Sequence, residues 1–466
     1  MDLITPTALR RGAGAALVAA ALSLAPAAAF AQQQPTPGGP GPAPAPTRPQ
    51  PDPTPQPQPQ PQPQPGPGPV VVQPPAEPQP DPAPQPQQPP IAAPPQPGSP
   101  PATGPTGLAA KTANAAKLGK ELDARLAGAF GWQWAIAQNG KFVLADGSGT
   151  ARSAADNGGT PLAMQPTMRW ELASLTKNVT AAATLKLLRL NGASAASSID
   201  KWLPAGWKRG PGFDTKSVTF EHLLTHTSGI KQMLVALPED EAAANAPNTW
   251  AGAKWVVAHG TKPGSKRAYK NMNYVLLSVL NAQLWRAVNG ELKVPQFPQI
   301  PIPVDATSYG IYGLDFFNKQ LFGPIGITGV TCFGDAAKAG LNYPAGATQQ
   351  TKGALGQWPL LNCASNAGLR LSSIEVVRWL SHLRFGKVMH PDDVATMDEL
   401  NAGWDQGWYA GGHRHGGDFT GTNQVHTCGA TFTDGTAVAL IVNSPLKAGS
   451  DYQCDIVRKA WQAAMP

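Results

Sequence analysis

Serine followed three residues later by lysine can form a nucleophile and its base, and this chain contains that spacing four times. A serine hydroxyl reacts well only when a neighbour takes its proton, and a lysine whose pKa is lowered by burial can do so. The serine must begin a helix, because one helical turn then brings the lysine beside it. Only Ser174–Lys177 opens a long apolar run, residues 179–190; the other pairs lie in loop-like sequence and begin at Ser198, Ser228 and Ser444. An N-capping serine followed by a solvated lysine is the structural alternative.

Two further short motifs follow in the chain. Tyr269-Lys-Asn271 is its one Tyr-x-Asn, and it lies between a proline-glycine turn and a helical pattern. His415-Gly-Gly417 is its one His-x-Gly, and it precedes a β-rich run. As structural alternatives, the tyrosine could be a half-buried loop aromatic and the asparagine a helix cap.

Together these three motifs carry a resemblance to a known family. The segment Arg169-Trp-Glu-Leu-Ala-Ser-Leu-Thr-Lys177 resembles the nucleophile segment of the serine β-lactamase and penicillin-binding-protein-like superfamily. The similarity is greatest to its class C branch and the related D-amino-acid peptidases and esterases. It covers roughly residues 125–465, with the motifs in the family's order. We therefore expect an α+β, β-lactamase-like domain.

The resemblance implies a role for each motif residue. Ser174 is the expected nucleophile and Lys177 its base, while Tyr269 is expected to pass a proton to the leaving group. Proximity to Lys177 is expected to favour the phenolate of Tyr269 or a shared proton. Asn271 is expected to bind the substrate amide carbonyl. His415 and Gly417 are expected to line the substrate site on the opposite wall.

The expected oxyanion hole joins the backbone N–H of Ser174 to that of Asp418. Such a donor contributes about 3 kcal/mol to transition-state stabilisation. Asp418 departs from the family, which has a small residue there, and a carboxylate beside a developing oxyanion is unfavourable unless it points away. His413 is one strand repeat from His415, so a shifted register of the third motif is an alternative.

The third motif also bears on the substrate. β-Lactamases carry Lys-Thr-Gly, whose ammonium attracts the β-lactam carboxylate, and a neutral histidine does so less. The sequence therefore predicts a D-amino-acid peptidase or an esterase that acts on a small molecule or a peptide, including cell-wall peptides. A β-lactamase is the alternative within the family, and a catalytically silent wall-binding domain is the alternative outside it. No cofactor or metal is expected, since His222 and His226, four residues apart, lack the glutamate of a zinc motif.

The pattern of elements must bring these distant motifs together. Two hairpins are predicted, at Asn139-Gly140 near the start of the domain and at Asp434-Gly435 near its end. The middle is mainly helical, so we expect an antiparallel sheet built from both ends of the domain, with flanking helices and an inserted helical subdomain. Predicted helices are Ser174–Asn191, Asn273–Val288, Gly313–Leu321, Ile374–Phe385 and Asp451–Ala464, and the proline-rich stretch Val294–Pro303 is a predicted surface loop.

Composition sets the expected organisation and location. Residues 1–31 read as a secretory signal, residues 32–106 as a disordered Pro/Gln-rich linker holding most of the 51 prolines, and residues 107–466 as the hydrolase domain. We therefore expect an exported protein with no stable membrane span after cleavage. The net charge of +7 is scattered, which gives no support to nucleic-acid binding.

Cysteine usage agrees with export. An exported chain with four cysteines suggests two disulfides. Three pairings are open, and we prefer the one that closes the shortest loops, Cys332–Cys363 with Cys428–Cys454.

Overall fold

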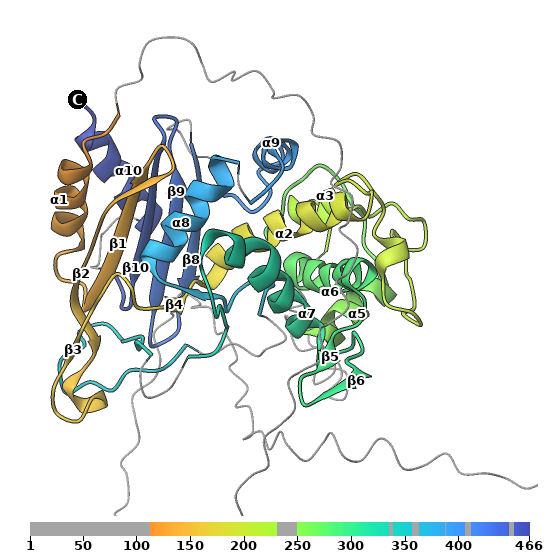
Figure 1. Ribbon diagram of the computed structural model, residues 1–466, viewed down its shortest axis with the longest axis horizontal. Coiled ribbons are helices and arrows are strands. Elements are labelled where there is room, and N and C mark those ends of the chain that lie inside the picture. Colours follow the sequence, from red (N-terminus) through yellow and green to blue (C-terminus); the bar gives the residue numbers. More distant parts are fainter. Residues whose placement is uncertain are drawn as a thin grey trace, which may run out of the picture. The chain divides into compact units, whose positions relative to one another are not determined.

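A six-stranded antiparallel sheet is built from the two ends of the domain (Figure 1). The computed structural model describes residues 112–230, 249–334, 339–356, 363–386, 388–405, 412–446 and 452–466. The predicted signal and Pro/Gln-rich linker lie outside the described residues. The strand order is β3-β2-β1-β10-β9-β8. Its strands are β1 (Gly131–Gln138), β2 (Lys141–Arg152), β3 (Leu162–Ala163), β8 (His413–Phe419), β9 (Val425–Thr431) and β10 (Thr436–Val442).

Both predicted hairpins form at the expected residues. Asn139 and Gly140 adopt φ values of 50° and 77°, the left-handed conformation that a two-residue hairpin turn requires. The second hairpin joins β9 to β10 through a longer turn, residues 432–435, in which Gly435 is left-handed (φ 82°) but Asp434 is not. Because β1 pairs with β10 over its whole length, the first and last parts of the domain meet at the centre of the sheet.

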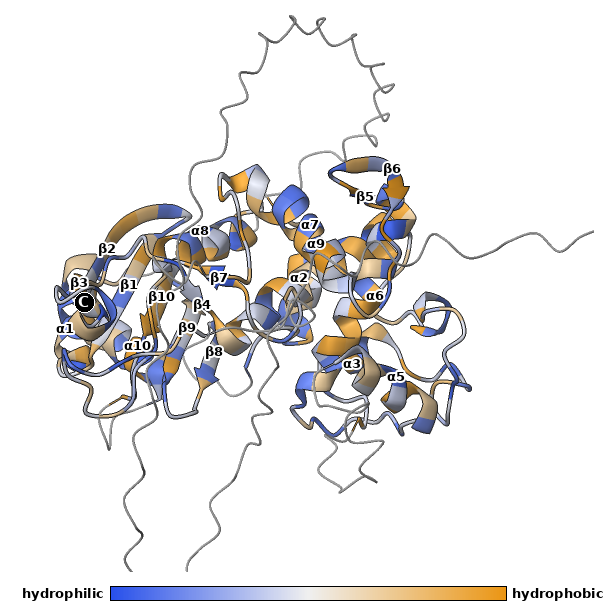
Figure 2. Ribbon diagram, turned by 90° about the horizontal axis from the view of Figure 1, so that it is seen from below, coloured by the Kyte–Doolittle hydropathy of each residue, from blue (hydrophilic) through white to orange (hydrophobic). Residues whose placement is uncertain are grey.

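Apolar side chains cover both faces of the sheet. In β1, Trp134 and Ile136 pack into a core with two terminal helices, whereas Ala135 and Ala137 face the main core. This alternation follows from the two-residue repeat of a strand. Figure 2 shows the apolar residues of β10 in the interior of the sheet. The covering helices are α1 (Ala115–Leu126) and α10 (Gln453–Ala464) on one face and α8 (Ser373–Arg384) on the other.

A helical region lies beside the β8 edge of the sheet (Figure 1). Its central helix α2 (Thr176–Leu190) is buried along most of its length and packs against α6 (Asn271–Asn289). The sheet and this helical region meet at the start of α2, where Ser174 lies. The remaining helices are α3 (Phe220–Leu224), α5 (Trp250–His259), α7 (Tyr309–Phe316) and α9 (Pro391–Glu399).

Several expectations about the elements need correction. The predicted loop Val294–Pro303 contains an exposed hairpin of β5 (Lys293–Val294) and β6 (Phe297–Pro301), because prolines are tolerated in edge strands. The helix predicted over Gly313–Leu321 ends as α-helix at Phe316 and continues as a π-helix, Phe317–Phe322. Two further elements, α1 and the short β4–β7 pair (Trp170–Glu171 with Arg370–Leu371), were not predicted.

The cysteines pair as preferred, Cys332 with Cys363 and Cys428 with Cys454. The second disulfide joins β9 to α10, next to the strand that carries the third motif. Among the described residues, no helix is long and apolar enough to cross a membrane.

Replacing Ser372 with alanine is expected to lower the free energy of unfolding by about 1 kcal/mol. Ser372 caps α8: its hydroxyl accepts the N–H of Glu375, and the Glu375 carboxylate accepts the N–H of Ser372. Urea unfolding measures the change. Ser265→Ala, on an exposed loop, is the control and is expected to change stability by less than about 0.5 kcal/mol. Equal effects of both substitutions would contradict the capping role.

Candidate active site

Ser174 lies in a single 3-10 turn, Ala173–Leu175, immediately before α2. Ala173 has a φ of 44°, a left-handed conformation that is uncommon for a residue with a side chain. The Thr427 hydroxyl of β9 donates to the Leu172 carbonyl at 2.8 Å and ties this turn to the sheet. The turn is therefore held from both sides, by α2 and by the strands.

Three functional side chains meet at the serine hydroxyl. Lys177 Nζ lies 2.9 Å from Ser174 Oγ, and the Tyr269 hydroxyl donates to the same oxygen at 2.9 Å. Lys177 follows on the first turn of α2, whereas Tyr269 comes from the segment before α6. The structure thus brings together three residues of the first two motifs.

Burial controls the protonation of Lys177. The residue is fully buried, and desolvation lowers its pKa to about 7, against a smaller raising effect of the Asp405 carboxylate. Its ammonium position is fixed by a 2.8 Å hydrogen bond to the Asn366 carbonyl. A large fraction of Lys177 is therefore neutral at pH 7, and a neutral amine can accept the serine proton.

Tyr269 is packed against an imidazole. The rings of Tyr269 and His226 are 4.5 Å apart, and His226 Nδ1 lies 3.3 Å from the Lys270 N–H and 3.2 Å from Asn273 Nδ2. Desolvation raises the pKa of Tyr269, although 38 % of the residue is exposed. This shift contradicts the phenolate alternative, because desolvation disfavours the charge and leaves Tyr269 with a neutral hydroxyl that can donate a proton, whereas the shared proton stays a prediction.

Two amides beside the centre have atoms without a hydrogen-bond partner. Asn271, the first residue of α6, has an unpartnered Oδ1, and Asn366 has an unpartnered Nδ2, as far as the described residues show. Asn366 is 1 % exposed. Since unpaired buried polar atoms are costly, both are suited to a substrate's polar groups.

The third motif lies on β8, the edge strand of the sheet. His415 is 2 % exposed, and its Nδ1 lies 2.9 Å from the Gly403 carbonyl. Burial lowers the pKa of His415, so its imidazole is neutral, and Nδ1–H donates to the carbonyl. His413 instead packs on the Trp404 ring at 5.4 Å, so the structure gives no support to a shifted register.

Within the described part of the chain, the backbone of β8 offers a donor without a partner near the nucleophile. Alternate N–H groups of a strand point to the same edge. The Gly416 N–H donates to the Asp405 carboxylate at 2.9 Å, and the Asp418 N–H points to the same edge two residues on. Gly417 lies against the Ser174 turn, since a Cβ there would be 3.0 Å from the Leu175 nitrogen and closer still to the Leu172 carbonyl.

The Asp418 carboxylate is anchored on the sheet side of β8. Its Oδ1 lies 2.6 Å from His426 Nδ1 and accepts from Gln453 Nε2 at 3.0 Å. Both bonds draw the carboxylate away from its own N–H, on the side of α10. The departure from the family therefore leaves the backbone donor accessible.

The two histidines four residues apart have separate structural roles. His222 completes the capping box of α3 with Thr219, whereas His226 lies beyond the end of that helix. Groups of three or more potential metal ligands are absent from the described part of the chain.

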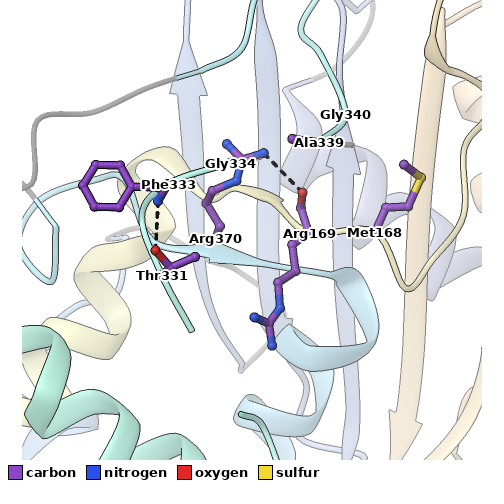
Figure 3. Close-up of a pocket in the computed structure, with 8 residues that line it drawn as sticks. All are labelled: Met168, Arg169, Thr331, Phe333, Gly334, Ala339, Gly340 and Arg370. Carbon is purple, nitrogen blue, oxygen red and sulfur yellow. Dashed lines mark hydrogen bonds between the residues drawn. The ribbon is translucent and has the colours of Figure 1, made fainter. Parts of the chain in front are cut away.

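A cavity of about 300 Å³ lies beside the β4–β7 pair, and Figure 3 shows the residues that line it. Two arginines line it, and both are engaged: Arg169 pairs with Glu375, and Arg370 donates to the Gly356 and Arg169 carbonyls. None of the three residues at the serine hydroxyl lines this cavity. We assign no function to this cavity.

Sequence reasoning missed several residues of this site. His226 was considered only as a metal ligand, and its position against the Tyr269 ring depends on the fold, as does that of Asn366 beside Lys177. Asp405, Tyr452 and Gln453 carry no motif, and only the fold brings them to β8.

Comparisons with known proteins give a family match over part of the chain. Residues 116–282 match the protein family described as Beta-lactamase. The protein Flp of Staphylococcus aureus is 29 % identical over 145 residues; this match covers 31 % of the chain and 28 % of that relative.

Solved structures share the fold at low sequence identity. The octameric penicillin-binding protein homologue of Pyrococcus abyssi (TM-score 0.53, 18 % identity) covers 74 % of this chain and 76 % of its own. The D-amino acid amidase of Ochrobactrum anthropi (TM-score 0.54, 17 % identity) covers 75 % and 97 %. The β-lactamase/D-alanine carboxypeptidase of Pseudomonas syringae (TM-score 0.53, 17 % identity) covers 75 % and 99 %.

The family match includes the Ser-x-x-Lys and Tyr-x-Asn segments, and the fold extends the similarity to the strand that carries His415. Residues 116–282 therefore match the β-lactamase family, and the described domain has the β-lactamase-like fold of these solved structures.

Proposed function

We propose that this protein is an exported acyl-transferring hydrolase that acts through Ser174, with peptides of D-amino acids or small esters as substrates. One observation carries the proposal: Ser174 Oγ lies 2.9 Å from both Lys177 Nζ and the Tyr269 hydroxyl. A base and a proton donor thus meet at one nucleophile.

The chemistry follows from these protonation states. Neutral Lys177 takes the Ser174 proton as Oγ attacks the substrate carbonyl. The N–H groups of Ser174 and Asp418 would stabilise the oxyanion. Tyr269 protonates the departing amine or alkoxide and regains a proton from Lys177, which leaves an acyl-serine. Water then attacks the acyl carbon, the carboxylic acid leaves, and Ser174 recovers its proton.

The neutral third motif favours a peptidase or esterase over a β-lactamase. His415 is buried and uncharged, so this wall of the site lacks the lysine that attracts a β-lactam carboxylate. The name of the Ochrobactrum relative, a D-amino acid amidase, is consistent with amide substrates. A β-lactamase is the second candidate, supported by the description of the matched family.

Export is supported by two disulfides, which persist in oxidising compartments. In this proposal, residues 1–31 are the signal, residues 32–106 a spacer and residues 107–466 the catalytic domain. The spacer would carry the domain away from its point of attachment to act on cell-wall peptides or other small substrates.

A substrate panel tests the function. The purified protein is offered a nitrophenyl ester, a peptide ending in D-Ala-D-Ala and a chromogenic β-lactam, with Ser174→Ala as control. We expect hydrolysis of the ester or peptide, slower β-lactam turnover, and an acyl adduct on Ser174 by mass spectrometry. A wild-type protein that hydrolyses none of them and forms no adduct would support the silent binding domain. Full activity of Ser174→Ala would overturn the site assignment.

A further inference from the structure

Two buried polar residues that the proposed chemistry does not use lie beside the second motif. His226 and Asn273 are 3 % and 1 % exposed. His226 follows α3, whereas Asn273 belongs to the first turn of α6, and the two side chains are in contact. Buried polar side chains need hydrogen-bond partners, and for these two residues several partners belong to the motif itself.

The contacts of Asn273 fix the orientation of its amide and the tautomer of His226. The Ser228 hydroxyl accepts the Ile230 N–H at 3.1 Å and donates to Asn273 Oδ1 at 2.5 Å. The opposite end of the amide faces the Lys270 carbonyl and His226 Nδ1, both at 3.2 Å. A carbonyl can only accept, so this end is Nδ2. Because Nδ2 only donates, His226 Nδ1 is an acceptor and the imidazole proton lies on Nε2.

His226 and Asn273 together hold both backbone polar groups of Lys270, the middle residue of the motif. The Lys270 N–H lies 3.3 Å from His226 Nδ1, and the Lys270 carbonyl accepts from Asn273 Nδ2. The His226 carbonyl also accepts the Ala268 N–H at 2.8 Å. The backbone on both sides of Tyr269 is therefore bonded to one residue, His226.

The His226 ring also packs on the Tyr269 ring, with centroids 4.5 Å apart and planes inclined by 35°. Desolvation lowers the pKa of His226 well below its ordinary value, and the nearby Lys177 acts in the same direction, so Nδ1 stays able to accept. His226 has a φ of 59°, a left-handed conformation that is uncommon for a residue with a side chain. Such a backbone persists only where its surroundings hold it.

We propose that His226 and Asn273 are positioning residues, which clamp Lys270 and thereby direct the Tyr269 hydroxyl toward Ser174 Oγ. Without this clamp, the Tyr269 hydroxyl does not stay 2.9 Å from Ser174 Oγ, and proton transfer to the leaving group slows. The inference rests on the proposed acyl transfer, in which Tyr269 protonates the leaving group.

Two esters of the same acid separate this role from a general loss of structure. Nitrophenolate is a weak base and leaves without a proton, whereas ethoxide needs one. Both esters give the same acyl-enzyme, and kcat/KM reports the steps up to its formation. His226→Phe keeps a ring beside Tyr269 but removes the acceptor. Its kcat/KM is expected to fall about ten- to a hundredfold more for the ethyl ester than for the nitrophenyl ester.

Two further variants complete the test. His226→Asn is the conservative rescue, because asparagine supplies an oxygen acceptor close to the position of Nδ1 and tolerates left-handed backbone. It is expected to keep the wild-type ratio of the two kcat/KM values. Asn273→Leu removes the other half of the clamp at a helical position and is expected to show the same selective loss, so the test stands even if His226→Phe does not fold. Thermal unfolding reports the fold of each variant.

His259→Phe is the matched control, since His259 is exposed and stacks on the Trp255 ring at 3.7 Å. It is expected to leave the ratio unchanged. An equal loss for both esters, an unchanged ratio in folded His226→Phe or Asn273→Leu, or a selective loss in His226→Asn would overturn the clamp.

The wild type itself separates the clamp from the function on which it rests. Turnover of the nitrophenyl ester alone would overturn the clamp, because no leaving group would then receive a proton from Tyr269. Turnover of neither ester, with no adduct on Ser174, would instead overturn the proposed function.

Discussion

Replacing Lys177 with methionine is expected to lower kcat/KM by about 10²- to 10⁴-fold, because the reaction loses the group that takes the Ser174 proton. Methionine keeps the length and apolar volume of the buried side chain, so the fold should be retained. The measurement is steady-state hydrolysis of the best substrate of the panel. Lys201→Met is the matched control: it alters another Ser-x-x-Lys pair, whose lysine lies over the Trp202 ring, and is expected to leave kcat/KM unchanged. A Lys177→Met variant with more than a tenth of wild-type activity would exclude lysine as the base.

The same residue sets the expected pH dependence. The pKa of Lys177 is about 7 and its active form is neutral, so kcat/KM should rise as the pH increases through about 7 and then level off. The two buried histidines of the site do not explain such a rise, because burial lowers the pKa of His226 and of His415 and both are neutral at pH 7. A profile that is flat between pH 6 and 8 with a rate-limiting acylation step would contradict this assignment.

Gly417→Ala is expected to lower kcat/KM by about a hundredfold or more. The added Cβ would collide with the Leu172 carbonyl and the Thr427 hydroxyl and lie 3.0 Å from the Leu175 nitrogen. Backbone cannot yield as a flexible side chain does, so the Ser174 turn must move away from β8. A displacement of about 1 Å at a catalytic group can cost a hundredfold in rate.

Overpacking at Gly417 should also cost about 1 to 3 kcal/mol of stability, which thermal unfolding would show as a lower Tm. Gly264→Ala is the control, because a Cβ there meets nothing within 4 Å. It is expected to change neither rate nor Tm appreciably. Wild-type kcat/KM in Gly417→Ala would mean that the contact between β8 and the nucleophile turn is dispensable.

Much of the fold could be predicted because local patterns and tertiary structure agree. Asn139-Gly140 and Asp434-Gly435 are residue pairs typical of tight turns, so both hairpins were identifiable, and Asn139, Gly140 and Gly435 adopt the left-handed conformation. The long apolar runs of α2 and α6 were visible for the same reason. In contrast, the β5–β6 hairpin escaped prediction, since short, proline-containing strands depend on what packs against them.

For the candidate site, the identity of the residues could also be predicted from the sequence, whereas their protonation states could not. The sequence by itself determined which serine, lysine and tyrosine could act, because motif order and helix position single out Ser174, Lys177 and Tyr269. Only the tertiary structure decided their protonation: desolvation lowers the pKa of Lys177 and raises that of Tyr269, which reverses the phenolate expectation. The burial of these two side chains depends on the packing of the whole domain, which no local sequence pattern specifies.

The position of the Asp418 carboxylate likewise depends on tertiary packing. From its type alone, a carboxylate at this position looked harmful to the oxyanion site. The structure anchors it through His426 on β9 and Gln453 on α10, eight and 35 residues away in the chain. The direction of a side chain depends on partners brought together by folding, so only the tertiary structure could show where this carboxylate lies.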